Sequence, residues 1–213
     1  MQYRSKADSF FREQEKNRIK EATETIEKGT IGEIAVMIVD SSDRYHDAEV
    51  TGGIFLGSLL SLIITISLFH SSVWSYIPLS FIFFFPSKLL LHKYPVLKKA
   101  FLGLKRKESA VMQRAVTAFY QKELYKTKKN TGVLFFISLF ERKVWVLADK
   151  GIYEKIDQQT LNKFADMVSA GIKEGRACDA LCSAIREAGE LLAKYFPITP
   201  DDTDELPDEV MTE

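Results

Sequence analysis

The sequence predicts an α/β protein: an α/β sandwich with a small mixed sheet, interrupted by a two-helix transmembrane hairpin. Lys88 is the single charged residue between Val50 and Leu91, in a chain of which 27% of the residues are charged. Apolar runs of strand length lie on both sides of this segment, at 31–39 and 133–139. Patterns of amphipathic helices surround these runs. Helices and strands in this order pack as layers around one sheet.

The N-terminal segment predicts a helix followed by a buried strand. Residues 4–28 form an amphipathic pattern, which Gly29 ends. The run 31–39 is almost continuously apolar, as is typical of a strand covered on both faces. The polar residues 40–43 end this strand, and the charge-poor segment follows almost at once.

Segment 50–91 is long enough to cross a bilayer twice, because one spanning helix needs about 20 apolar residues. It divides at residues 70–72, which predicts a short turn that returns the chain to the side it left. The second span contains Pro78 and Pro86, which predict kinks. Neither span contains Asp, Glu or Arg, so no ion or proton pathway is predicted.

Two glycines in the first span predict a close helix contact. Gly53 and Gly57 have the spacing at which small residues allow two helix backbones to approach. The partner helix is either the second span or another copy of the chain, which would make this face a self-association surface.

Basic residues set the predicted orientation of the hairpin. The segment after the second span contains six of them and no acid: Lys93, Lys98, Lys99, Lys105, Arg106 and Lys107. The turn at 70–76 contains none, and basic flanks stay cytoplasmic. No apolar signal segment precedes the hairpin. We therefore expect two spans in the cell (inner) membrane with both termini cytoplasmic. The basic segment either binds anionic lipid or serves only as a topology signal.

The C-terminal part predicts the rest of the sheet and its helices. Residues 108–126 predict a helix, 133–139 and 143–149 an antiparallel strand pair, and 152–156 a short edge strand. Two helices follow at 158–173 and 178–196. The acidic tail, 197–213, is either solvated or part of a cation site.

The helix and strand before the hairpin cannot bury a core alone. We therefore predict one discontinuous domain of residues 1–49 and 92–196, a hairpin at 50–91 and a tail at 197–213. The formal net charge of zero gives no indication of nucleic-acid binding. Cys178 and Cys182 are one helical turn apart and are interpreted as reduced core residues. No phosphate-binding loop or catalytic triad motif is present.

Several segments of the sequence resemble a known family. The segments are Gly32-Glu33-Ile34, the block from Thr131 to Ile152, Glu174-Gly175, Ala184-Ile185 and Asp204-Glu205-Leu206-Pro207-Asp208. Together they resemble the TPM domain, a family that includes a thylakoid lumen protein, Psb32 and MOLO-1. The resemblance implies an α/β/α sandwich with a small mixed sheet. It also implies roles as varied as acid phosphatase activity, photosystem repair and receptor modulation, and calcium binding by acidic residues at one end of the sheet.

The candidate site residues follow from this resemblance. Five acidic residues match positions in the family's motifs: Glu33, Asp149, Asp204, Glu205 and Asp208. Carboxylates suit Ca²⁺ or Mg²⁺, and such an ion could activate water for phosphate release. The alternatives are structural: Glu33 caps or pairs with a lysine, Asp149 shapes a turn with Gly151, and the tail acids are solvated.

The favoured function is non-enzymatic. The sequence predicts a membrane-anchored TPM-like module, exposed to the cytoplasm, that binds other membrane proteins and assists assembly or quality control of their complexes. The alternative is a divalent-metal-dependent, acid-type phosphatase that uses the acidic residues.

Overall fold

The structure is a computed structural model that describes residues 5–68, 73–127, 129–198, 206 and 208–213. The predicted turn at 70–72 lies outside these residues. The chain divides into two compact units, one of residues 1–43 with 108–213 and the other of residues 44–107. We describe each unit by itself.

The first unit contains the small mixed sheet that the sequence predicts. Its four strands are β1 (Glu33–Val39), β2 (Gly132–Ser138), β3 (Lys143–Ala148) and β4 (Met211–Thr212), in the order β3-β2-β1-β4. β1 is parallel to β2 and to β4, whereas β2 and β3 are antiparallel. β4 was not predicted, because its two residues lie in the expected solvated tail.

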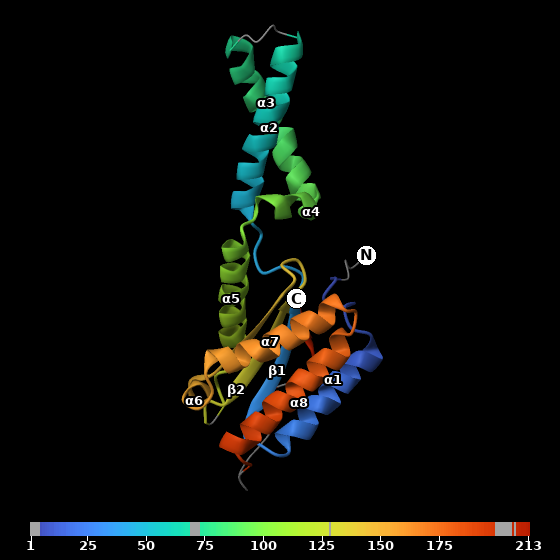
Figure 1. The fold of residues 1–213 in the computed structure, drawn as a ribbon, viewed down its shortest axis with the longest axis vertical. Coiled ribbons are helices and arrows are strands. Elements are labelled where there is room, and N and C mark those ends of the chain that lie inside the picture. The colour runs from blue at the N-terminus through green and yellow to red at the C-terminus, as the bar shows by residue number, and fades with distance from the viewer. Residues whose placement is uncertain (1–4, 69–72, 128, 199–205, 207) are drawn as a thin grey trace. The chain divides into compact units, whose positions relative to one another are not determined.

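Helices cover both faces of this sheet. α1 (Glu13–Glu27), α7 (Gln158–Lys173) and α8 (Ala177–Tyr195) lie side by side across one face (Figure 1). In β1, Ile34, Val36 and Ile38 point toward these helices. The alternate residues of β1 pack with residues 111–119 of α5 (Leu104–Gln121) on the other face. Cover on both faces explains why β1 and β2 are apolar throughout.

The N-terminal helix is shorter than predicted. α1 begins at Glu13, because Arg12 has extended backbone angles (φ −70°, ψ 158°). The backbone N–H of Arg12 donates to Glu15 Oε2 at 2.8 Å, so a glutamate in the first turn stabilises this start. Phe11 precedes the helix and is buried in the core.

The predicted edge strand at 152–156 is wrong, because residues Lys150–Tyr153 form the short helix α6. The carboxylate of Asp149 accepts the N–H of Lys150 at 2.7 Å, which starts a helical turn. Gly151 donates its N–H to Asn130 O at 3.1 Å. A Cβ at Gly151 would lie 2.6 Å from that oxygen, so this approach requires glycine. Ile152 is fully buried, which anchors the turn to the core.

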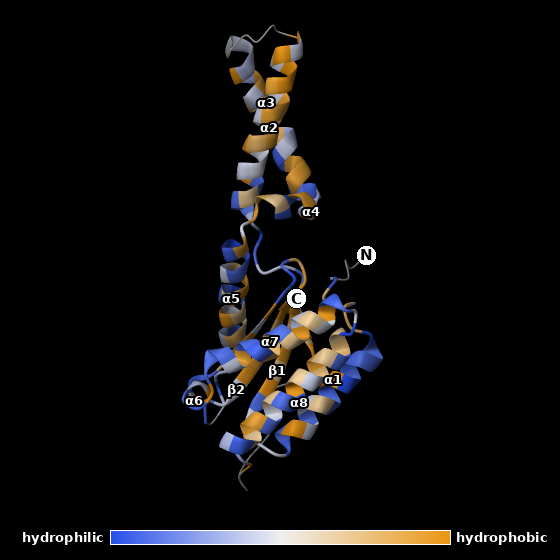
Figure 2. Cartoon of the chain, in the orientation of Figure 1, coloured by the Kyte–Doolittle hydropathy of each residue, from blue (hydrophilic) through white to orange (hydrophobic). Residues whose placement is uncertain are grey.

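The second unit consists mainly of two long helices that pack against each other, α2 (His46–Leu68) and α3 (Val73–Lys93). Both are long and apolar enough to cross a membrane. Figure 2 shows hydrophobic residues along much of α2. A Cβ at Gly57 would lie 2.9 Å from the backbone N of Phe84, and one at Gly53 would lie 3.1 Å from Lys88 Cβ. The two glycines therefore lie in the contact between α2 and α3 of the same chain. The short helix α4 (Pro95–Lys98) and a 3-10 turn, Lys99–Phe101, follow.

Candidate functional site

Two of the predicted acidic residues lie at the same end of the sheet. Glu33 is the first residue of β1 and pairs in register with Gly132, the first residue of β2. Asp149 follows β3 directly, and its N–H donates to Gly132 O at 2.8 Å. Side chains alternate along strands, so Glu33 and Asp149 share the α5 face, separated by two strand spacings or about 10 Å.

A third carboxyl group, Glu27, completes this end of the sheet and was missed in the sequence. Glu27 is the last residue of α1, and its Oε1 accepts the N–H of Ile34 at 3.0 Å. Burial, a hydrogen bond with the side chain of Asp208 and the charge of Glu33 together raise the pKa of Glu27 to about 9. Glu27, Glu33 and Asp208 therefore interact, although no regular spacing in the sequence signals this grouping.

The shift at Glu27 has a clear chemical meaning. Two carboxyl groups that hydrogen-bond to each other hold one proton between them, because two negative charges at this distance repel. At neutral pH the carboxyl group of Glu27 is therefore protonated, and its O–H donates a hydrogen bond to Asp208. A cation is the other means of relieving such repulsion, and carboxylate oxygens suit Ca²⁺ or Mg²⁺.

The described part of the chain supplies only some of the predicted ligand set. Among those residues, no group of three or more Asp, Glu, His or Cys side chains is arranged to hold a metal ion. Asp149 accepts the Lys150 N–H through Oδ1, while its buried Oδ2 has no hydrogen-bond partner within the described residues. Asp204 and Glu205 lie outside the described residues. Asp149 therefore caps α6, and the predicted metal site stays a prediction.

The six basic residues predicted at the membrane surface do not form one set. Lys98 is buried, with its Nζ 2.6 Å from Glu49 Oε1 and 3.1 Å from the carbonyl oxygen of Arg44. It therefore joins α4 to the base of α2 inside the second unit. Arg106 pairs with Asp47 at 3.2 Å. The remaining four, Lys93, Lys99, Lys105 and Lys107, are partly or fully exposed.

Comparisons with known proteins agree with the sheet and helices described above. Residues 102–191 match the TPM domain. Among solved structures, the chain is similar to the NMR structure of the BA42 protein from the psychrophilic bacterium Bizionia argentinensis. The two are 21% identical, the similarity covers 96% of each chain, and the TM-score is 0.61. At this identity the similarity concerns the fold alone. A search of curated proteins found no match.

Proposed function

We propose, from the premise that this chain is a TPM-domain protein in residues 102–191, that it is a membrane-anchored module that binds other proteins of membrane complexes. It would assist their assembly or quality control. The observation that carries the proposal is the interruption of one sheet by the two long helices. β1 and β2 pair along their whole length, from Glu33 with Gly132 to Val39 with Ser138. The chain between them contains the whole second unit, so the domain has two connections to it.

The surface of the second unit supports membrane anchoring. Large apolar side chains of α2 and α3 are exposed: Ile54, Phe55, Leu59, Leu60, Leu62, Ile63, Ile66, Leu68, Trp74, Ile77, Phe81, Ile82, Phe85, Leu89 and Leu90. Exposure of so large an apolar surface to water is unfavourable in free energy, whereas contact with lipid tails is not. The small or hydroxyl-bearing residues Gly53, Gly57, Ser61 and Thr65 are buried instead, as expected for the interface of a helix pair in a membrane.

The basic residues support a cytoplasmic location for both ends of the chain. Lys93, Lys99, Lys105 and Lys107 follow the second long helix and are accessible. Lysines at this position favour the cytoplasmic side of the inner membrane. A domain held there by two connections would meet partners that lie in or on the same membrane.

A binding role also suits the chemistry of the domain's cysteines. Burial raises the pKa of Cys178 to about 12 and raises that of Cys182 as well. Both thiols are therefore protonated at neutral pH, and the thiolate is the nucleophilic form. Each thiol lies against α1, with Cys178 Sγ 3.7 Å from Glu15 O and Cys182 Sγ 3.8 Å from Arg18 O. These contacts make them part of the packing between α1 and α8.

The test is crosslinking in intact cells of the full chain, compared with residues 44–107 fused to an unrelated soluble domain. We expect alkaline carbonate to leave both proteins in the membrane, because the second unit is the anchor. We expect the full chain, but not the fusion protein, to crosslink a reproducible set of membrane proteins. Carbonate extraction of the full chain, or the same crosslinks from both proteins, would refute the proposal.

The alternative function is a divalent-metal-dependent phosphatase. Its support is the grouping of Glu27, Glu33 and Asp208, together with the match to a family named TPM phosphatase. The purified full chain should be assayed for phosphate release from p-nitrophenyl phosphate with Ca²⁺, with Mg²⁺ and with EDTA. The binding role predicts no metal-dependent turnover. Turnover that needs the metal and disappears in Glu33→Gln would establish the phosphatase instead.

A further inference from the structure

The first unit contains a cavity of about 670 Å³ that the proposed function does not use. Its wall includes the last residues of β2, the turn to β3, the C-terminal turns of α7 and the N-terminal segment. The size lies in the usual range for small-molecule sites, about 300–1,000 Å³. Ser138, the last residue of β2, pairs with Val39 at the end of β1. The cavity thus lies at the carboxyl ends of two parallel strands, where ligands bind in open α/β sheets.

The charges around this cavity have one sign. Four basic residues line it, Lys6, Arg142, Lys143 and Lys173, and none of the lining residues is acidic. Lys143 Nζ pairs with Glu108 at 2.6 Å. Within the described residues, the side chains of Lys6, Arg142 and Lys173 have no ion pair. Like charges gathered at one cavity repel each other, and a bound anion relieves that repulsion.

Two nearby carboxylates are held by other groups. Asp40 accepts the backbone N–H groups of Lys6 at 3.2 Å and Ala7 at 2.6 Å. Glu141 accepts the N–H of Ser42 at 3.1 Å and also bonds the hydroxyl of Ser138. Neither carboxylate lines the cavity, so the lining itself contains basic residues and no acidic one.

The remaining wall is largely apolar. Phe10, Leu139 and Ile172 are partly buried, and Val144 belongs to the core. Ser9, Ser138 and Ser169 also line the cavity. A ligand that matches this wall has an anionic group and an apolar body.

The backbone of Arg142 adds a further indication. Its φ is 54°, in the left-handed region that glycine or asparagine adopts at lower cost than arginine. An arginine at such a turn position is unfavourable for folding, which suggests that its guanidinium has a use. That use fits the cavity, since a guanidinium forms paired hydrogen bonds with a carboxylate.

We propose that this cavity binds a small organic anion with an apolar body, such as an aromatic carboxylate. Arg142 and Lys173 hold the anionic group, and Phe10, Leu139 and Ile172 contact the apolar body. Arg142 and Lys173 also line a neighbouring cavity of about 290 Å³ that includes Glu108 and Asp166. Because those two acids oppose an anion, the larger cavity is the binding site.

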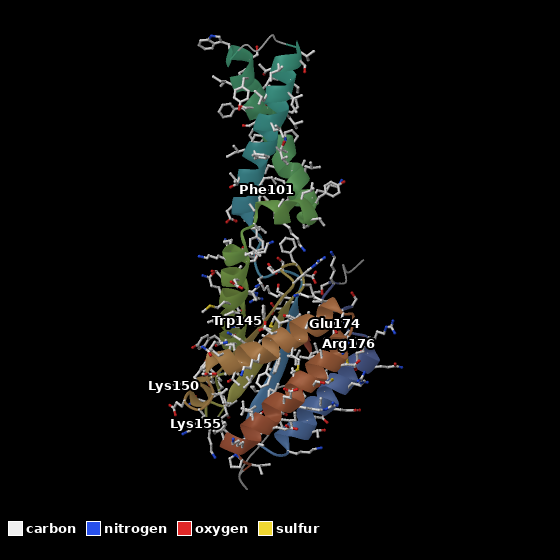
Figure 3. The ribbon with its side chains drawn as sticks, viewed as in Figure 1. Phe101, Trp145, Lys150, Lys155, Glu174 and Arg176 are labelled. Atoms are coloured by element: carbon white, nitrogen blue, oxygen red, sulfur yellow. The ribbon has the colours of Figure 1, made fainter. Side chains whose placement is uncertain are left out.

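The test uses the full chain in phosphatidylcholine nanodiscs, with naphthalene-2-carboxylate as the probe and isothermal titration calorimetry as the measurement. Naphthalene-2-carboxamide has the same apolar body without the charge. The test variants are Lys173→Gln and the pair Arg142→Gln with Lys173→Gln. The matched control is the pair Lys150→Gln with Lys155→Gln. Figure 3 shows these two exposed lysines near α6, at the other end of α7 from Glu174 and Arg176.

We expect the carboxylate to bind at least about tenfold more tightly than the carboxamide, because an anion gains charge-assisted hydrogen bonds. The Arg142→Gln with Lys173→Gln pair should weaken carboxylate binding by about tenfold or more, and Lys173→Gln by less. The control pair should leave affinity unchanged. Binding should also weaken as salt is raised.

Three outcomes would overturn the proposal. One is equal binding of the carboxamide, which would mean that charge is not recognised. Another is an equal loss in the control pair, which would indicate attraction to net positive charge alone. The third is loss of probe binding when the nanodiscs contain phosphatidylglycerol, which would identify an anionic lipid headgroup as the occupant.

Discussion

Replacing Glu27 by glutamine should remove a pH dependence from the stability of the domain. Burial, the hydrogen bond with Asp208 and the charge of Glu33 together raise the pKa of Glu27 from 4.5 to about 9. Between these values the folded state holds a proton that the unfolded state has released. The free energy of unfolding therefore falls as pH rises through this window, and the stability is highest below it.

The magnitude follows from the proton difference. One full proton gives a slope of about 1.4 kcal/mol per pH unit. We take half of this slope, because Glu27 is only partly buried and shares its proton with Asp208. The expected loss from about pH 5 to about pH 8 is then about 2 kcal/mol.

The assay is urea unfolding of the full chain in nanodiscs with EDTA present, across this pH range. In Glu27→Gln, the amide oxygen can still accept the Ile34 N–H, and the amide N–H can donate to Asp208. We expect a flat profile and a gain of about 2 kcal/mol over the unmodified chain at about pH 8. Glu21→Gln, an exposed change on the same helix, is the control. A flat profile for the unmodified chain, or a less stable Glu27→Gln at about pH 8, would refute the reasoning.

Three further predictions concern packing. Gly132→Ala places a Cβ 2.5 Å from the backbone oxygen of Leu124, so urea unfolding should show a loss of about 2–3 kcal/mol, whereas an unchanged midpoint would contradict the close approach. Gly57→Ile should separate α2 from α3, because a Cβ there would lie 2.9 Å from Phe84 N. Limited proteolysis should then cleave the second unit faster, and Leu59→Ile, on an exposed position of α2, should leave the rate unchanged. Lys98→Met leaves Glu49 buried without its lysine and should destabilise the second unit by about 3–5 kcal/mol, a loss that Glu49→Gln should largely reverse in a thermal unfolding experiment.

Local patterns predicted most of the fold. The boundaries of α7 match the prediction at both ends, because its apolar residues recur at helical spacing and Asp157 caps its start. β1 and β2 were found because a buried strand is a short apolar run. That both parts of the chain form one sheet also followed from the order of the elements, since the strand before the hairpin needs segments from beyond the hairpin to cover its apolar faces.

Contacts between distant segments account for the errors. The chain at 150–153 is a helix because Asp149 caps it and Gly151 approaches Asn130. β4 is two residues long and exists only through its pairing with β1. The approach of Gly151 to Asn130 and the pairing of β4 with β1 have no local pattern, and Asp149 was interpreted as part of a turn and not as a helix cap.

The sequence alone determined the longer helices, the strands β1, β2 and β3 and the two long apolar segments, because each depends on the spacing or length of apolar residues along the chain. The tertiary structure decided which side chains meet. Glu27 lies beside Asp208, and Gly53 and Gly57 pack against α3. Lys6, Arg142, Lys143 and Lys173 line one cavity. The physical reason is that pairing of parallel strands brings together residues about a hundred positions apart, a proximity that no local pattern contains.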